Sequence, residues 1–261
     1  MQVIAKLRLE ISLRVRRLLR HAQNFRSKDP FSAKANKEFN HLVREHRSPL
    51  SRNLKGVDPI LFKNKKTNLE IAIQGLKGMT IEPGEVFSFW KYAGKPSARR
   101  GFLPGLGIQT GRGVASVGGG LCQLSNSLHW LALHSDLKVI ERHHHSLDLF
   151  PDDARQVPFG TGATLLYNYK DFRLKNLTDN SYRFDFELND HQLIVKLLAS
   201  SPLPHRYEVL ERDHEFLERA EGLFRKNRIV REKYDLQNLK IAEEELFKNF
   251  VKCQYSRGEI K

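Results

Sequence analysis

The chain has few cysteines, no long apolar run and few acidic residues near its N-terminus. Its two cysteines, Cys122 and Cys253, are too far apart among 261 residues to suggest a small disulfide framework or a paired metal motif. No run of about eighteen or more apolar residues is present, which excludes an uninterrupted transmembrane helix. The first residues also lack the apolar core and small-residue cleavage site of a signal peptide. We therefore expect a globular protein in a reducing compartment, the cytoplasm.

Basic residues are concentrated in the N-terminal quarter of the chain. The net charge is +14, and residues 1–66 hold 17 Lys and Arg against 5 Asp and Glu, a local excess of 12. Between Met1 and Arg20, apolar and basic residues recur at the spacing of an amphipathic helix. The apolar set is Ile4, Leu7, Ile11, Val15 and Leu18, and the basic set is Lys6, Arg8, Arg14, Arg16, Arg17 and Arg20.

Two interpretations of this basic helix are open. It can lie on an anionic membrane surface, or it can pack on the main domain with its basic face in water. Nucleic-acid binding is not expected, because the basic residues come without interleaved aromatic residues or a known reader motif.

The run 118–125, Gly-Gly-Gly-Leu-Cys-Gln-Leu-Ser, places a cysteine directly after three glycines. Apolar residues follow at the spacing of one helical face, which predicts a helix that begins near Cys122 and ends near Asp136. In the first turn of a helix, free amide hydrogens and the positive end of the helix dipole favour a thiolate. Because glycines allow close approach of backbone and ligand, the run predicts a nucleophilic cysteine beside a binding loop.

A second polar segment, Glu141-Arg142-His143-His144-His145, follows about twenty residues later. Its alternation predicts a strand that places His143 and His145 on the face of Glu141, and Arg142 with His144 on the other face. The two segments together predict a cysteine–histidine site.

We assign roles to these residues as follows. Cys122 would attack an acyl carbon, His145 or His143 would act as general base and then acid, and Glu141 would orient an imidazole. The substrate-binding set is Gly118, Gly119, Gly120, Gln123, Ser125, Arg142 and His144. Backbone amides near Cys122, helped by Gln123, would bind the oxyanion, and Arg142 would bind a substrate carboxylate.

Less reactive interpretations of the same residues stay open. Cys122 can be a packed hydrophobe, in which case the glycine-rich cleft, Arg142 and the histidines would form a non-catalytic peptide-binding module. His143 and His145, with Cys122 or Asp152, also offer ligands of the type that zinc accepts, at a nonstandard spacing. Our prediction is that no metal and no cofactor is held.

The rest of the pattern predicts an α+β fold, with N-terminal helices followed by a mixed core in which the Cys122 helix packs on a largely antiparallel sheet. Residues 27–58 are interpreted as a helical connector, 67–70 as a capping box that begins a helix ended by Gly78, and 86–90 as a short strand. Further strands are predicted at 137–145, 163–169, 172–176, 182–188, 192–198, 207–216, 223–234 and 241–255. We expect a basic helical region (1–58), a core domain (59–204) and a C-terminal β-rich extension of that core (205–261).

Several motifs resemble the VanW family. They are the run 118–125, Glu141-Arg142-His143-His144-His145-Ser146, Phe150-Pro151-Asp152, Pro158-Phe159-Gly160-Thr161-Gly162, Tyr167-Asn168-Tyr169 and Pro83-Gly84-Glu85-Val86-Phe87-Ser88-Phe89-Trp90. The likeness extends from about residue 47 to about residue 255. Because the family is associated with glycopeptide-resistance gene clusters and bacterial envelope proteins, the resemblance implies an accessory role in glycopeptide (vancomycin) resistance or cell-envelope metabolism. It also implies that the partner is a peptide-like fragment of a peptidoglycan precursor.

Overall fold

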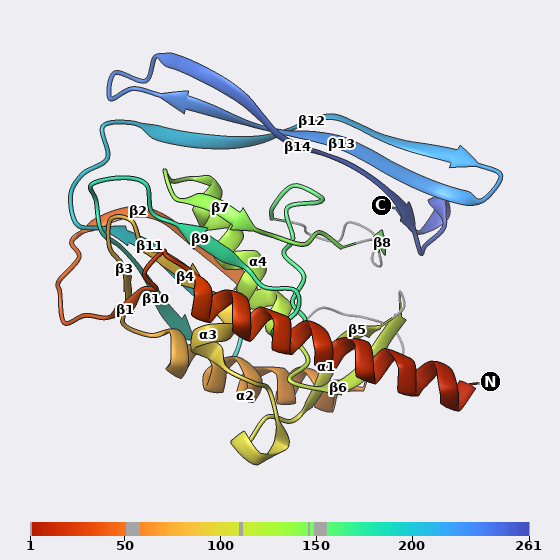
Figure 1. Ribbon diagram of the computed structural model, residues 1–261. Coiled ribbons are helices and arrows are strands. Elements are labelled where there is room, and N and C mark those ends of the chain that lie inside the picture. The colour runs from red at the N-terminus through yellow and green to blue at the C-terminus, as the bar shows by residue number, and fades with distance from the viewer. Residues whose placement is uncertain (1, 51–57, 110–111, 146, 149–155, 261) are drawn as a thin grey trace.

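The computed structural model describes residues 2–50, 58–109, 112–145, 147–148 and 156–260 (Figure 1). Its helices are α1 (Gln2–Arg26), α2 (Pro59–Leu76), α3 (Phe89–Ala93) and α4 (Leu121–Leu133), with short 3-10 turns at Ala98–Arg100 and Arg257–Glu259. Its strands are β1 (Ala33–Lys34), β2 (His41–Pro49), β3 (Met79–Ile81), β4 (Val86–Ser88), β5 (Pro104–Gln109), β6 (Arg112–Val117), β7 (Lys138–Glu141), β8 (Leu147–Asp148), β9 (Arg173–Lys175), β10 (Tyr182–Leu188), β11 (Gln192–Ala199), β12 (Arg206–Arg219), β13 (Gly222–Tyr234) and β14 (Lys240–Cys253).

The central sheet has five strands in the order β1-β3-β10-β11-β2, and its neighbouring strands are antiparallel. Its main hairpin joins β10 to β11, with Leu188 opposite Leu193, so the chain turns between the two strands predicted at 182–188 and 192–198. Two smaller sheets, β4-β9-β7 and β5-β6, complete the core region. The expected α+β class is therefore confirmed.

Helix α4 occupies the centre of the core and packs against β2 and β11. Leu124, Leu128 and Leu131 are fully buried on it, at the spacing that predicted the helix. Helix α2 adds Leu69 and Leu76 to the same cluster. The cysteine-bearing helix thus packs on a largely antiparallel sheet, as expected, and ends at Leu133, slightly before the predicted end.

The C-terminal strands form a separate sheet rather than a continuation of the central one. Its order is β12-β13-β14-β8, where β8 pairs with β14 in parallel and the other pairs are antiparallel. Figure 1 shows β12, β13 and β14 as a long layer that lies across the core above α4 and β7. Trp130 and Leu133 of α4 pack with Val209 and Ile229 between the two layers.

Two local predictions near the N-terminus are wrong. The supposed helical connector contains strands. Strand β2 pairs with β11 along nearly its whole length, because its backbone bonds to the edge of the sheet while about every second side chain is exposed to solvent. The supposed capping box lies inside α2. This helix begins earlier because Pro59 suits a first helical position and the Asp58 carboxylate accepts a hydrogen bond from the Ile60 amide at 2.9 Å.

Two other segments also differ from prediction. The 86–90 strand is β4 for its first half only, because the Ser88 hydroxyl caps α3 by accepting from the Lys91 amide. Residues 163–169 form no strand and hold only an isolated bridge between Leu166 and Lys170. Their backbone groups bond mainly to side chains of other segments.

Asn68 of α2 ties three parts of the core together. Its Nδ2 donates to the carbonyls of Leu103 at 3.0 Å and Gly119 at 2.9 Å, and its Oδ1 accepts from the Leu103 amide at 2.8 Å. The side chain is fully buried. It thereby fixes the loop that leads into α4.

Replacing this residue should destabilise the fold strongly. We expect Asn68→Ala to lower the free energy of unfolding by about 2–4 kcal/mol, because it leaves buried backbone groups without their partner. Asn64→Ala is the matched control on the same helix, since Asn64 donates a single bond to the Pro104 carbonyl and should cost about 1 kcal/mol. Urea denaturation measures both, and equal losses would contradict the role of Asn68.

Candidate functional site

The three glycines before α4 are required by close packing. Gly118 and Gly120 have φ angles of 78° and 98°, in the left-handed region. A Cβ on Gly119 would overlap the Gly105 backbone, and one on Gly120 would overlap the Lys65 side chain. Close packing therefore accounts for the glycines without a ligand, and the substrate-binding role of Gly118, Gly119 and Gly120 stays a prediction.

Cys122 lies in the first turn of α4, where the sequence places it, but its electrostatics differ from the prediction. The side chain is partly exposed, and its sulfur accepts a hydrogen bond from the Leu165 amide. Burial by the surrounding atoms nevertheless raises the pKa of the thiol, and this outweighs the amide hydrogen bonds. The expected thiolate at the helix start is not favoured, because desolvation disfavours the charged form.

An irregular segment, residues 159–165, lies between α4 and the histidine segment, and side chains bond to its backbone. The Ser125 hydroxyl donates to the backbone carbonyl of Ala163 at 2.6 Å. The side-chain Oδ1 of Asn126 accepts from the backbone amide of Ala163 at 2.7 Å. His129, one turn further along α4, contacts the Thr161 carbonyl through Nδ1 at 2.6 Å. Side chains on one face of α4 thus make the backbone hydrogen bonds that a neighbouring strand would otherwise make with this segment.

Two side chains that the sequence assigned to substrate also bond to the protein backbone. The Arg142 guanidinium donates to the carbonyls of Gly160 and Gly162, the latter at 2.9 Å. It lies 4.1 Å from the centre of the Phe247 ring, and burial lowers its pKa to about 10. The Gln123 amide donates to the Ser48 hydroxyl at 2.8 Å and to neighbouring carbonyls at the end of β2. The Arg142 side chain therefore holds the backbone of residues 160–162, and the Gln123 side chain holds the end of β2.

The histidines diverge because β7 ends at Glu141. His143 contacts the Glu141 carboxylate at 3.0 Å, as the predicted shared face requires. His145 instead contacts the Thr164 hydroxyl at 2.9 Å and lies over Gly162, the residue that also binds Arg142. The predicted separation of Arg142 and His145 onto opposite faces is therefore wrong, since both side chains contact residues 159–165. His144 is exposed.

Cys122 and His145 meet at this segment. The sulfur accepts from the amide of Leu165, and the imidazole contacts the side chain of its neighbour Thr164. Burial and the nearby Arg142 cation lower the pKa of His145 to about 4, so this imidazole is neutral at pH 7. The structure therefore brings a protonated thiol and a neutral imidazole to consecutive residues.

Glu141 lies at the centre of a second network. Its Oε1 is 2.6 Å from Nη2 of Arg20 on α1, and it accepts from the Asp171 amide at 3.0 Å. The Asp171 carboxylate is buried and accepts from the Ser88 hydroxyl at 2.6 Å, and burial raises its pKa to about 6. Sequence reasoning missed Asp171 and Asn126 because their partners, Ser88 and Ala163, lie about 80 and 40 residues away in the sequence.

The metal alternative gains no support from the part of the chain that the structure describes. Within those residues no three His, Cys, Asp or Glu side chains gather closely enough to hold a metal ion. Asp152, one proposed ligand, lies outside the described residues.

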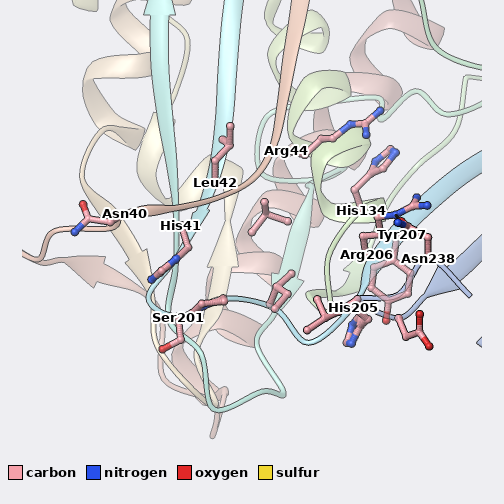
Figure 2. A pocket seen from close by; sticks show the side chains of 15 residues that line it. Asn40, His41, Leu42, Arg44, His134, Ser201, His205, Arg206, Tyr207 and Asn238 are labelled. Atoms are coloured by element: carbon pink, nitrogen blue, oxygen red, sulfur yellow. Dashed lines mark hydrogen bonds between the residues drawn. The ribbon is translucent and has the colours of Figure 1, made fainter.

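Two hollows lie where the C-terminal sheet meets the core. The larger, of about 490 Å³, is lined by β2, the end of α4, the connector before β12 and the turn after β13. Figure 2 shows Arg44, His134, His205 and Arg206 around it. The smaller, of about 420 Å³, is lined by residues of α4, β7, β13 and β14 that include Arg142 and Arg231. Cys122 lines neither of these two hollows.

The buried histidine of α4 should make the protein sensitive to acid. Burial lowers the pKa of His129 to about 3 from its ordinary 6.5, so the unfolded chain takes up a proton below pH 6.5 that the folded chain does not. Stability is therefore complete above that pH and falls as the pH decreases towards 3. We expect this residue alone to reduce the free energy of unfolding by about 2 kcal/mol between pH 7 and pH 5.

The measurement is urea denaturation at both pH values. His129→Asn preserves an amide donor near the Thr161 carbonyl and should reduce the fall by about that amount, whereas His144→Asn, at an exposed site, should leave it unchanged. A His129→Asn protein with the unmodified pH dependence would contradict the assignment.

Comparison with known proteins identifies the family of this chain. The family described as "VanW like protein" matches residues 64–198. The chain is 30% identical over 176 residues to the vancomycin B-type resistance protein VanW of Enterococcus faecalis (strain ATCC 700802 / V583), an alignment that covers 67% of this chain and 64% of that protein. It is 24% identical over 144 residues to the uncharacterized protein YoaR of Bacillus subtilis (strain 168), over 55% of this chain and 46% of that protein.

The chain thus spans less than two thirds of the length of either relative. No solved structure matches it. The family match covers α2 to β11, which is the part of the molecule that holds Cys122, the histidines and the 159–165 segment. The chain belongs to the VanW family.

Proposed function

We propose that this protein is an accessory protein of glycopeptide resistance or cell-envelope metabolism that acts by binding an anionic, peptide-like peptidoglycan precursor. The relation to a vancomycin B-type resistance protein supports the biological setting. Binding is favoured over catalysis because Gln123, Ser125 and Arg142 donate to the protein's own backbone. These side chains hold the fold, so their donors are already used within the protein.

The larger hollow carries the binding proposal. Arg44 and His134 lie side by side in it, with Arg206 and His205 on the same side (Figure 2). Burial, with a smaller contribution from the Arg44 cation, lowers the pKa of His134 and of His46 to about 4. Both imidazoles are therefore neutral at pH 7, and Arg44 is the side chain of this group that offers an anionic ligand a full positive charge and paired donors.

The dimensions and lining of the hollow suit such a ligand. Its volume of about 490 Å³ is in the range of small-molecule sites. Ser201 and Asn238 offer neutral hydrogen-bonding groups, and Leu203 and Leu236 offer apolar contact. A peptide fragment carries carboxylates for the cations and amides for the neutral groups.

A second candidate, cysteine-dependent acyl transfer or hydrolysis, rests on one observation. Cys122 and His145 contact the adjacent residues Leu165 and Thr164, so a small rearrangement of this segment would bring thiol and imidazole into contact. Against this, burial keeps the thiol protonated and the imidazole weakly basic.

Calorimetric titration of the intact chain with a soluble muramyl pentapeptide tests the binding proposal. We expect saturable binding, weakened at least about tenfold by Arg44→Gln because a charge-assisted hydrogen bond is lost. Arg47→Gln is the matched control on β2, where Arg47 pairs with Glu45 at 2.7 Å and lies outside the hollow. Absence of binding by the intact chain, or equal loss in the two variants, would contradict the proposal.

Thiol reactivity separates the two candidates. Because burial raises the pKa of Cys122, we expect iodoacetamide to alkylate it at pH 7.5 at least about tenfold more slowly than glutathione, whose thiol is in water. Mass spectrometry of the Cys122 peptide measures the rate independently of Cys253. Alkylation faster than glutathione, with a midpoint well below about pH 8.5, would overturn this expectation and favour catalysis.

A further inference from the structure

Helix α1 is attached to the domain by its polar side. Arg20 pairs with Glu141 at 2.6 Å, and Arg17 donates to the Tyr167 carbonyl at 3.3 Å. The Asn168 amide donates back to the Arg17 carbonyl at 3.1 Å. The sequence left open that this helix packs on the domain with its basic face in water. The helix does pack on the domain, but that interpretation is wrong about which face it uses, because Arg17 and Arg20 make the contacts.

The apolar side of α1 faces away from the domain. With about 100° between successive residues of a helix, Arg17 and Arg20 lie opposite the apolar stripe. That stripe consists of Ile11, Val15, Leu18, Leu19 and Phe25, whose exposed fractions range from 48% at Val15 to 92% at Phe25. Figure 1 shows α1 lying along the outside of the core. An exposed apolar stripe of this length is unusual for a surface that meets only water.

The charges beside the stripe are almost all positive. Arg8, Arg14, Arg16 and Arg26 are exposed on α1, and Glu10 is the only acidic residue before Asp29. A second copy of the chain on this face would bring like charges together, which opposes association. An anionic lipid surface offers both a hydrocarbon phase for the stripe and phosphates for the arginines.

We propose that α1 lies in the plane of an anionic bilayer surface, with the stripe in the acyl region and its arginines at the headgroups. No helix in the described part of the chain is long and apolar enough to cross a membrane. The proposed contact of α1 with the bilayer is a peripheral one. The polar contacts of α1 then hold the domain against that surface. This inference rests on α1 alone and is independent of the ligand in the hollow.

Vesicle flotation of the intact chain tests this arrangement. We expect it to float with phosphatidylcholine vesicles that contain 30% phosphatidylglycerol, at least about tenfold more tightly than with phosphatidylcholine alone, and less tightly in high salt. The double variant Leu18→Gln and Leu19→Gln should reduce binding to anionic vesicles at least about tenfold, because it removes apolar area from the stripe.

The matched control is the double variant Leu239→Gln and Ile241→Gln. Leu239 and Ile241 are 65% and 55% exposed at the start of β14, far from α1 in sequence and outside the hollow, and their replacement should leave binding unchanged. Circular dichroism checks that both variants fold. The proposal is overturned if the intact chain does not float, or if the two double variants bind equally. It is also overturned if sedimentation velocity shows a dimer that Leu18→Gln and Leu19→Gln abolish while vesicles stay unbound.

Discussion

The fold depends on the need to hydrogen-bond an irregular backbone segment inside the molecule. From Phe159 to Leu165, each residue has a backbone group that is hydrogen-bonded either to a side chain or to the His143 carbonyl. The side-chain partners are Asn227 and Asn249 for residue 159, Arg142 for residues 160 and 162, His129 for residue 161, Ser125 and Asn126 for residue 163, and Cys122 for residue 165. The amide of residue 164 donates to the His143 carbonyl. An unpaired buried amide or carbonyl costs about 1–3 kcal/mol, so these side chains are held by the backbone they satisfy. The motifs at 118–125, 141–145 and 158–162 thus meet at this segment.

This constraint also explains why a cysteine–histidine pair is present without the electrostatics of a nucleophile. The dense packing that satisfies the segment also desolvates Cys122 and His145, and desolvation disfavours both charged forms. A thiolate–imidazolium pair needs the opposite, a site in which charge is stabilised before reaction. Proximity in sequence and space is therefore explained here by backbone satisfaction, and the hollow lined by Arg44 at the edge of the C-terminal sheet is the site that we propose for a charged ligand.

Sequence periodicity predicted the elements that bury a regular face, and failed where side chains bond to backbone. Helix α4 and strands β10 to β14 follow from apolar spacing and turn residues, since burial selects one residue in two or in three to four. Strand β2 was missed because the apolar Leu42 is exposed while the polar His41 and Glu45 are half-buried, so hydrophobicity does not alternate along the strand. Residues 163–169 look like a strand in composition, yet their partners, Ser125 and Asn126, lie on a helix, and no periodic rule connects them.

The orientation of α1 follows from the same competition between charge and apolar burial. Glu141 is largely buried, with about 15% of its side chain exposed, and Arg20 supplies the cation beside it. Turning α1 to bury its apolar stripe would remove that cation and leave the carboxylate with only His143 and the Asp171 amide as partners, which lowers stability. It would also remove the Arg17 contact with the Tyr167 carbonyl. Burying the stripe against a domain surface that offers carbonyls and a carboxylate would not recover this loss, so the helix presents its apolar residues outward.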